Sequence, residues 1–171
     1  MIASATTGPA LVRLQERFGD RILATHDYRG DATALVAAEA IVEICRWLKS
    51  EPGLEFEILM DLTAVDYLKR RPRFEVVYHL YSLRHRQRLR LKVPADGDQP
   101  EVPSLTALWR GADWYEREVW DLFGIRFTGH PDLRRIMLYP EFVGHPLRKD
   151  YPYNKRQPRV PPRAGGGAHV T

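Results

Sequence analysis

The sequence predicts an α+β protein, in which a mostly antiparallel sheet packs in two layers on helices and an extended C-terminal arm follows. Three observations lead to this prediction. Apolar residues recur at helical spacing in two N-terminal segments. Three consecutive segments then have the composition of strands: 56–67, 73–82 and 87–93. From residue 128 to residue 163 the chain holds seven prolines and no long apolar period. The expected parts are an α+β domain (1–125), an extended arm (126–155) and a disordered Pro/Gly-rich tail (156–171).

The first 50 residues are expected to form two helices separated by a short strand. Leu11, Leu14 and Phe18 share one helical face, and Gly19 follows as a stop signal. Residues 21–26 are a short strand candidate. The second helix has the stronger pattern. Its cap would be Asp31 or Thr33, Glu51-Pro52-Gly53 would end it, and its apolar stripe consists of Leu35, Ala38, Val42, Cys45 and Leu48.

Cys45 is the only cysteine of the 171 residues. Its place on the apolar stripe predicts a buried small hydrophobic side chain rather than a nucleophile. A single thiol excludes a disulfide framework and an iron–sulfur cluster held by several thiolates of this chain alone. The sequence also lacks the Gly-rich phosphate loops and the G-x-S-x-G turn of common enzyme classes. We therefore expect no flavin, cluster or metal on this chain, and no catalytic residue.

The central strands are expected to form an antiparallel sheet with one basic face. A short polar link joins residues 73–82 to residues 87–93, as in a hairpin. The second of these strands alternates strictly, and its polar face carries Arg88, Arg90 and Lys92. The surrounding block 67–93 holds nine basic residues and one acidic residue, a net charge of +8. Such a block is typical either of a solvated face or of a surface matched to a charged partner.

A further helix is predicted from Asp113 to Gly124. Asp113 and Glu116 have capping-box spacing, and Gly124 is a stop signal. Arg117 and Asp121 can form a pair at positions i and i+4. The mixture of carboxylates with an arginine indicates an ion-pair network rather than an acid with a raised pKa. We therefore expect the carboxylates of this helix to pair with basic groups: Glu116, Glu118 and Asp121.

The arm repeats the tripeptide Gly-His-Pro, at residues 129–131 and 144–146. Proline biases the histidine before it to an extended conformation, and glycine lets the backbone approach another surface closely. A metal site would need three or four convergent ligands, and the histidines offer no His-x-x-x-His pair. The arm also holds seven sizeable apolar residues, more than is usual for a disordered tail. We expect a segment that becomes ordered only against a partner, with a self-packed loop as the alternative.

Two blocks of this chain resemble a known family. The segment EREVWDLFGIRFTGHPDLRRIM (116–137) is similar to the signature of the C subunits of NADH–quinone oxidoreductase, respiratory complex I. GHPLRKDYP (144–152) resembles the second block of that family, and DLTAVDY (61–67) resembles the end of its central strand. Trp120 stands where another aromatic residue is more usual.

The resemblance implies a non-redox scaffold subunit in the peripheral arm of a proton-translocating NADH:quinone oxidoreductase. FMN and the iron–sulfur clusters would then belong to partner subunits, and the C-terminal arm would lie against the D subunit of the complex. The chain would support NADH dehydrogenase activity only as part of the complex. It would lie on the cytoplasmic side of the bacterial inner membrane as a peripheral protein. No apolar run approaches the ~20 residues of a membrane span, so the membrane would be reached only through the complex.

The residues expected at the partner interface come from the last helix and the arm: Glu116, Arg117, Glu118, Asp121, His130, Pro131, Arg134, Arg135, His145, Pro146, Arg148, Lys149 and Asp150. Two alternatives remain. Related membrane-bound hydrogenases have a similar subunit. A nucleic-acid-binding module could instead place the basic strand face at 84–92 on phosphates, and salt-dependent binding to bulk nucleic acid would identify it. We expect no nucleic acid among the partners.

Overall fold

The structure is a computed structural model that describes residues 8–160. Its elements follow along the chain in the order α1 (Pro9–Phe18), β1 (Ile22–Tyr28), β2 (Asp31–Val36), α2 (Ile41–Ser50), β3 (Ile58–Asp66), β4 (Phe74–Ser82), β5 (Gln87–Ala95), β6 (Glu101–Pro103), α3 (Ala112–Phe123) and β7 (Arg126–Thr128). Short 3₁₀ turns precede β1 and α2 (Gly19–Arg21 and Ala38–Ala40).

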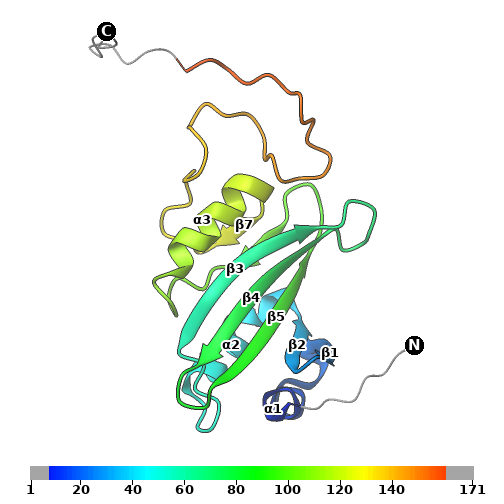
Figure 1. The fold of residues 1–171 in the computed structure, drawn as a ribbon, viewed down its shortest axis with the longest axis vertical. Helices are drawn as coiled ribbons and strands as arrows, with labels where there is room; N and C mark the ends of the chain where they lie inside the picture. Colours follow the sequence, from blue (N-terminus) through cyan, green and yellow to red (C-terminus); the bar gives the residue numbers. More distant parts are fainter. Residues whose placement is uncertain (1–7, 161–171) are drawn as a thin grey trace.

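The main sheet has five strands in the order β1-β2-β5-β4-β3. All neighbouring strands are antiparallel except β2 and β5, which run parallel. Figure 1 shows α2 behind the long strands and α3 beside the upper half of β3. The α+β class and the mostly antiparallel sheet packed on helices are therefore confirmed. The three strands expected at 56–67, 73–82 and 87–93 are β3, β4 and β5.

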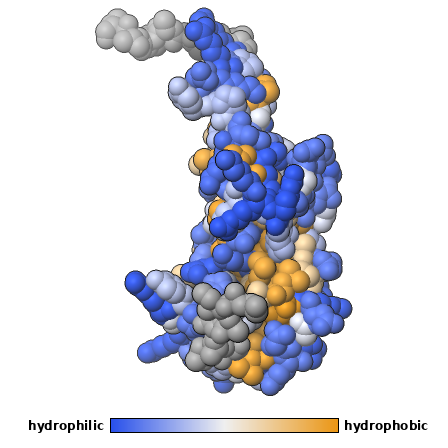
Figure 2. Space-filling model, turned by 90° about the vertical axis from the view of Figure 1, so that its right-hand side faces the viewer, coloured by the Kyte–Doolittle hydropathy of each residue, from blue (hydrophilic) through white to orange (hydrophobic). Residues whose placement is uncertain are grey.

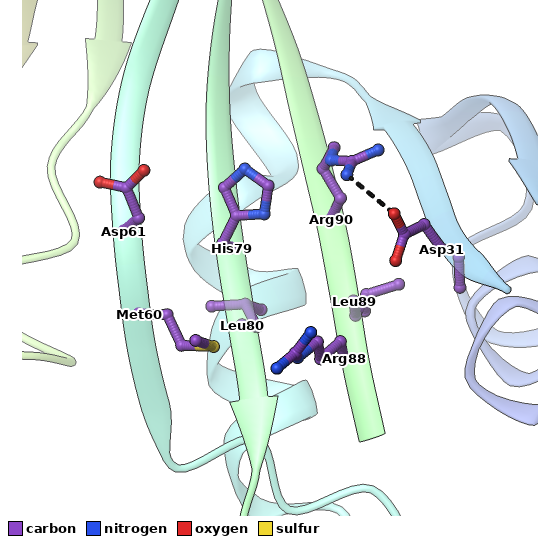
Figure 3. Close-up of a pocket in the computed structure, with 9 residues that line it drawn as sticks. Asp31, Met60, Asp61, His79, Leu80, Arg88, Leu89 and Arg90 are labelled. Atoms are coloured by element: carbon purple, nitrogen blue, oxygen red, sulfur yellow. Dashed lines mark hydrogen bonds and ion pairs between the residues drawn. The ribbon is translucent and has the colours of Figure 1, made fainter. Parts of the chain in front are cut away.

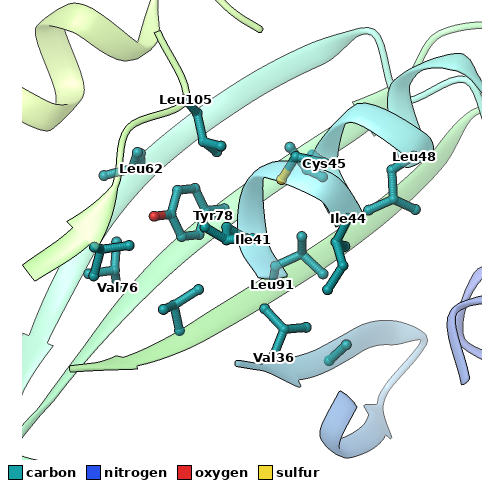
Figure 4. Close-up of a cluster of buried hydrophobic side chains, with 14 of the residues drawn as sticks. Val36, Ile41, Ile44, Cys45, Leu48, Leu62, Val76, Tyr78, Leu91 and Leu105 are labelled. Carbon is teal, nitrogen blue, oxygen red and sulfur yellow. The ribbon is translucent and has the colours of Figure 1, made fainter. Parts of the chain in front are cut away.

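The core lies between this sheet and α2 because the strands alternate and the helix has an apolar stripe. Figure 4 shows Tyr78 and Leu91 of the sheet facing Ile41 and Cys45 of α2. All four side chains are fully buried. Burial raises the pKa of the Cys45 thiol far above its usual value, as expected for an inert packing residue.

The second helix is shorter than the sequence predicts. Residues 31–36, expected to cap and begin it, form β2, which pairs with β1 through a turn in which Gly30 donates to the Asp27 carboxylate at 3.0 Å. The α-helix itself begins only at Ile41. Ala34 and Val36, two residues apart, both face the core from β2. The strand beside β5 buries these apolar side chains as completely as the predicted helix would have done.

A second, small sheet extends the domain beyond the predicted boundary at residue 125. β6 and β7 pair in parallel, with Val102 opposite Phe127 and both side chains buried. Residues 126–128 therefore belong to the domain rather than to the arm. Within residues 8–160, no helix is both long and apolar enough to cross a membrane.

Candidate functional site

The arm, here residues 129–155, lies above α3 and beside the end of β3 (Figure 1). α3 begins at Ala112, one residue before the predicted start, and no side chain caps it. Its buried positions include three ionisable residues: Glu116, Arg117 and Asp121. Buried ionisable groups need hydrogen-bond partners. The partners of these three come from the arm and from the loop before α3.

Asp121 is fully buried and holds the first part of the arm. One carboxylate oxygen, Oδ2, accepts three successive backbone N–H groups at 2.9–3.0 Å, those of Ile136, Met137 and Leu138. The other, Oδ1, accepts from the Arg135 guanidinium. Burial alone would raise the pKa of Asp121, but these donors outweigh it and the pKa is lowered. Asp121 is thus paired with a basic group, as expected, and the base comes from the arm.

Arg117 also binds the arm, through its backbone. Nε donates to the carbonyl oxygen of Arg134 at 3.1 Å, and Nη2 donates to that of Arg135 at 3.2 Å. The expected pair of Arg117 with Asp121 is therefore wrong. The nearest carboxylate to Arg117 is that of Asp113, at 3.9 Å. Tertiary contacts with the arm replace the i, i+4 pair because they satisfy more of the guanidinium donors.

The two Gly-His-Pro histidines bracket α3. His130 Nε2 lies 3.3 Å from the carbonyl oxygen of Asp113, near the start of the helix, while its Nδ1 accepts the backbone N–H of Asp132 at 3.0 Å. His145 Nδ1 lies 2.9 Å from the carbonyl oxygen of Asp121, near the end of the helix. Burial lowers the pKa of His145, which favours the neutral ring. Each histidine therefore acts as a hydrogen-bond donor that fixes one bend of the arm.

The glycine of each tripeptide has a positive φ, +84° at Gly129 and +101° at Gly144. Residues with a Cβ rarely adopt this conformation. At Gly144 a Cβ would also lie 2.8 Å from the Tyr151 ring. The tripeptide repeats because both bends need the same backbone geometry followed by a histidine that reaches α3.

A second buried carboxylate, Asp66 at the end of β3, holds the other end of the arm. It accepts Nε and Nη2 of Arg73 at 2.9 and 2.7 Å and the backbone N–H of Lys149 at 2.8 Å. Arg73 also forms two hydrogen bonds to Asp150, at 2.9 and 2.8 Å. Hydrogen bonds from Arg73 hold the pKa of Asp66 far below its usual value. The sequence places Asp66 in the segment DLTAVDY, at the end of a predicted strand, but does not indicate that it binds the arm.

Arg148, the residue before Lys149, also holds this end of the arm. Its Nε donates to the carbonyl oxygen of Phe123, the last residue of α3, at 2.5 Å. Its guanidinium lies 5.3 Å from the ring centre of Phe74, the first residue of β4. Arg148 therefore joins the arm to both the helix and the sheet.

Glu116 differs from the sequence expectation. It is fully buried and, within residues 8–160, has no basic partner: its carboxylate accepts the Ser104 hydroxyl at 2.7 Å and the Leu105 N–H at 2.6 Å. Burial raises its pKa to about 7, and these two donors oppose the shift only in part. The expected ion pair is wrong here because α3 turns this side chain toward the loop and away from the arm.

The raised pKa of Glu116 has a consequence for stability. Between pH 4.5 and 7 the folded chain keeps a proton that the unfolded chain releases, so stability falls as pH rises through this window. Glu116→Gln should therefore raise the free energy of unfolding at pH 8 by about 1–3 kcal/mol, and by much less at pH 5. Urea unfolding at both pH values measures this. The control Glu118→Gln, at an exposed position of α3, should change it by less than about 0.5 kcal/mol. Equal effects of Glu116→Gln at the two pH values would contradict the shift.

The other expected interface residues lie at the surface. Exposed positions are Glu118, Pro131, Arg134, Lys149 and Asp150, and Pro146 is half-buried. Among residues 8–160, Glu118 forms no ion pair, so its expected basic partner is absent from the described part of the chain. The expectation that the arm finds partners only on another protein also needs correction, because Arg135, Arg148 and Asp150 bind within this chain.

Over the described residues, no group of three or more His, Cys, Asp and Glu side chains is placed to hold a metal ion. The chemistry that the arrangement does provide is hydrogen bonding between buried carboxylates and the backbone of the arm.

Comparisons with known proteins identify the family of this chain. Residues 34–157 match the family described as respiratory-chain NADH dehydrogenase, 30 kDa subunit. The NADH-quinone oxidoreductase C 2 subunit of Rhizobium etli (strain CIAT 652) is 48% identical over 165 residues, which cover 95% of this chain and 88% of the relative. The corresponding C subunit of Geobacter sulfurreducens is 47% identical over 149 residues, covering 86% of this chain and 91% of the relative.

Two solved structures are also similar. A trypsin-resistant fragment (1-134) of Nqo5 has a TM-score of 0.64 and 35% identity, covering 72% of this chain and 99% of the fragment. A chain of the membrane-bound sulfane sulfur reductase, an archaeal respiratory membrane complex, has a TM-score of 0.70 and 25% identity, covering 84% of each chain. From these matches and the family model, the chain belongs to the 30 kDa subunit family of respiratory-chain NADH dehydrogenase, the family of the NADH-quinone oxidoreductase C subunits.

Proposed function

We propose that this chain is a non-redox scaffold subunit in the peripheral arm of a proton-translocating NADH:quinone oxidoreductase, and that it binds the D subunit of that complex and its neighbours. In this proposal FMN and the iron–sulfur clusters reside in partner subunits. The complex acts at the cytoplasmic side of a bacterial inner membrane, where this chain is peripheral. The observation that supports a scaffold role is that Asp121 and Asp66, both buried, each accept backbone N–H groups of the arm. Asp121 and Asp66, which lie in segments that resemble the family, thus position the surface of the arm.

The outer side of the arm fits a partner with apolar and acidic groups. Met137 and Leu147 are 61% and 49% exposed, and Tyr153 is 98% exposed. Four exposed cations lie in the arm or directly after it: Lys149, Lys155, Arg156 and Arg159. Figure 2 shows this upper part of the molecule as mostly hydrophilic, with small apolar areas between the charged ones. Isolated apolar side chains among cations are suited to a specific polypeptide surface.

Affinity purification tests the proposal. The full chain is tagged in its bacterial host, membranes are solubilised, and co-purifying proteins are identified by mass spectrometry. We expect the D subunit, together with flavin and iron–sulfur subunits and NADH:quinone activity of the assembly. Purification of the chain without other respiratory subunits would contradict the proposal.

A second candidate is the equivalent subunit of a related membrane-bound oxidoreductase, such as a hydrogenase. The similarity to a chain of the sulfane sulfur reductase supports it. The same purification distinguishes the two, because only the first assembly contains a subunit that oxidises NADH.

Charge placed on the outer side of the arm should prevent assembly without unfolding the chain. Met137→Asp with Leu147→Asp puts two carboxylates where apolar contact is expected, and burial of an unpaired charge is costly. We expect recovery of the chain in the complex to fall roughly tenfold or more, with unchanged thermal unfolding of the isolated chain. The control Val12→Asp, at a 41% exposed site on α1, should assemble normally. Normal assembly of the double variant would exclude this side of the arm as the interface.

A further inference from the structure

The sheet face opposite α2 carries a hollow of about 370 Å³ (Figure 3). It is lined by four strands, with Asp31 and Ala32 from β2, Met60 and Asp61 from β3, His79 and Leu80 from β4, and Arg88, Leu89 and Arg90 from β5. None of these residues belongs to the arm or to α3, so the hollow is separate from the arm contacts described above.

Strand register explains why polar groups meet in this hollow. Asp61 lies opposite His79, His79 opposite Arg90, and Arg90 beside Thr33, so one row of side chains crosses four strands. A β-bulge between Leu59 and Asp61 brings two consecutive residues, Met60 and Asp61, to the exposed surface. Bulges re-aim side chains in this way and are frequent at functional sites.

The bulge is held in place from the side. The Tyr115 hydroxyl of α3 donates to the carbonyl oxygen of Met60 at 3.1 Å. The Met60 side chain remains 44% exposed at the rim of the hollow. An exposed, flexible thioether beside charged groups is a common component of protein-binding surfaces.

The two arginines of the hollow have few partners of their own. In the described part of the chain, Arg90 makes only long contacts, 3.5 Å to the Asp31 carboxylate and 3.3 Å to the Thr33 hydroxyl. Arg88 is exposed and forms no ion pair within residues 8–160. Burial and the nearby Arg90 lower the pKa of His79, so its ring is neutral and can accept or donate a hydrogen bond. The β5 side of the hollow can therefore bind one carboxylate through guanidinium groups.

The rest of the sheet face does not fit a polyanion. Three carboxylates stand among the cations: Asp31, Asp61 and Glu75. Lys92 is paired with Glu75 at 3.0 Å, and Arg84 with Glu55 at 2.7 Å. The basic strand face that the sequence suggested for phosphates is thus largely neutralised by strands and loops distant in sequence. A continuous phosphate backbone would meet these carboxylates, whereas a single protein side chain need not.

We propose that this hollow is a docking site for another polypeptide of the same assembly, which inserts an aspartate or glutamate side chain between Arg88 and Arg90 and packs an apolar side chain on Met60. This inference rests on the proposed function for the existence of the assembly, and it assigns a second interface on the sheet, apart from the arm. A carboxylate between Arg88 and Arg90 would accept hydrogen bonds from both guanidinium groups. Asp61, at the opposite rim of the hollow, would favour a basic residue of the partner next to that carboxylate.

A photo-cross-linker tests the site in the intact complex. p-Benzoylphenylalanine replaces Met60 in the tagged full-length chain, membranes are irradiated, and cross-linked peptides are identified by mass spectrometry. We expect one polypeptide of the complex, with an aspartate or glutamate near the cross-linked residue. Adding Arg88→Glu should lower the cross-link yield roughly tenfold or more, because charge reversal at a paired arginine weakens an interface strongly. Exchange of the identified carboxylate for lysine should restore it.

Two controls keep the outcomes distinct. Arg46→Glu makes the same charge change at an exposed position of α2 and should leave the yield unchanged. Arg88→Gln removes the charge with little change of shape, and its thermal unfolding verifies the fold. Normal co-purification with no Met60 cross-link, or a cross-link to nucleic acid or to a second copy of this chain, would overturn this inference alone. Loss of co-purification in the unmodified chain would overturn both it and the proposed function.

Discussion

Asp121→Ala should release residues 135–138 from α3 in the isolated chain. The substitution removes the acceptor of three backbone N–H groups and of the Arg135 guanidinium at once. Hydrogen bonds to charged groups contribute about 1.5–3 kcal/mol each, although neighbouring bonds are not additive. We expect the free energy of local opening of this segment to fall by about 3 kcal/mol, which is roughly a 100-fold loss of amide protection.

Amide hydrogen exchange of Ile136, Met137 and Leu138, measured with and without the substitution, checks this expectation. Asp132→Ala is the matched control, because Asp132 also pairs with an arm arginine, Arg134 at 2.7 Å, but both side chains are more than half exposed. It should leave exchange at 136–138 nearly unchanged. Full protection of these amides in Asp121→Ala would mean that apolar contacts alone hold the segment.

Asp66→Ala should destabilise the domain as well as the arm. Asp66 is 3% exposed and binds Arg73, the N–H of Leu68 at 2.7 Å and the N–H of Lys149 at 2.8 Å. Without it, the largely buried Arg73 keeps, among residues 8–160, only the exposed Asp150 as an ion-pair partner. Removal of one member of a buried ion pair typically costs about 3–5 kcal/mol. We expect a loss of this size in the free energy of unfolding at pH 7, measured by urea denaturation.

The effect of Asp66→Ala should depend on pH. The pKa of Asp66 is lowered in the folded chain, so its contribution to stability is fully present above its ordinary value of 3.8 and is lost as pH falls below it. The difference from the unmodified chain should therefore be constant from pH 5 to 7 and shrink in more acidic solution. Glu101→Ala, which breaks an exposed pair with Arg126 at 3.8 Å, should change stability by less than about 1 kcal/mol. A similar loss in both variants would contradict a special role for Asp66.

The contacts of Asp121, Asp66, His130 and His145 hold the arm on its own domain, and this affects how the arm would bind a partner subunit. A segment fixed on its own domain loses less conformational entropy when it docks than a free one does. Each ordered residue costs on the order of 1–2 kcal/mol, so fixing the bends at His130 and His145 beforehand lowers the entropic cost of docking.

The class of the fold, the long strands and the family could all be predicted from the amino-acid sequence. Strict alternation in 87–93, and alternation interrupted only at Val77 in 73–82, turn one side of each strand to the core, so β4 and β5 were predictable from local pattern. The lone cysteine on an apolar stripe predicted a buried packing residue, and the EREVWDLFG and GHPLRKDYP blocks identified the family.

Which charged side chains pair with one another could not be predicted without the three-dimensional structure. Asp66 and Lys149 are 83 residues apart in sequence, and Asp121 pairs with Arg135 rather than with the helical neighbour Arg117. Local spacing cannot rank such partners, because a carboxylate in water gains little from one nearby arginine but much from several donors in a buried site. Likewise, the local sequence of β2 resembles a helix cap. It forms a strand because it pairs in parallel with β5, a segment distant in sequence. Pairings of this kind are stabilised by burial, and burial requires that segments distant in sequence pack together in the folded chain.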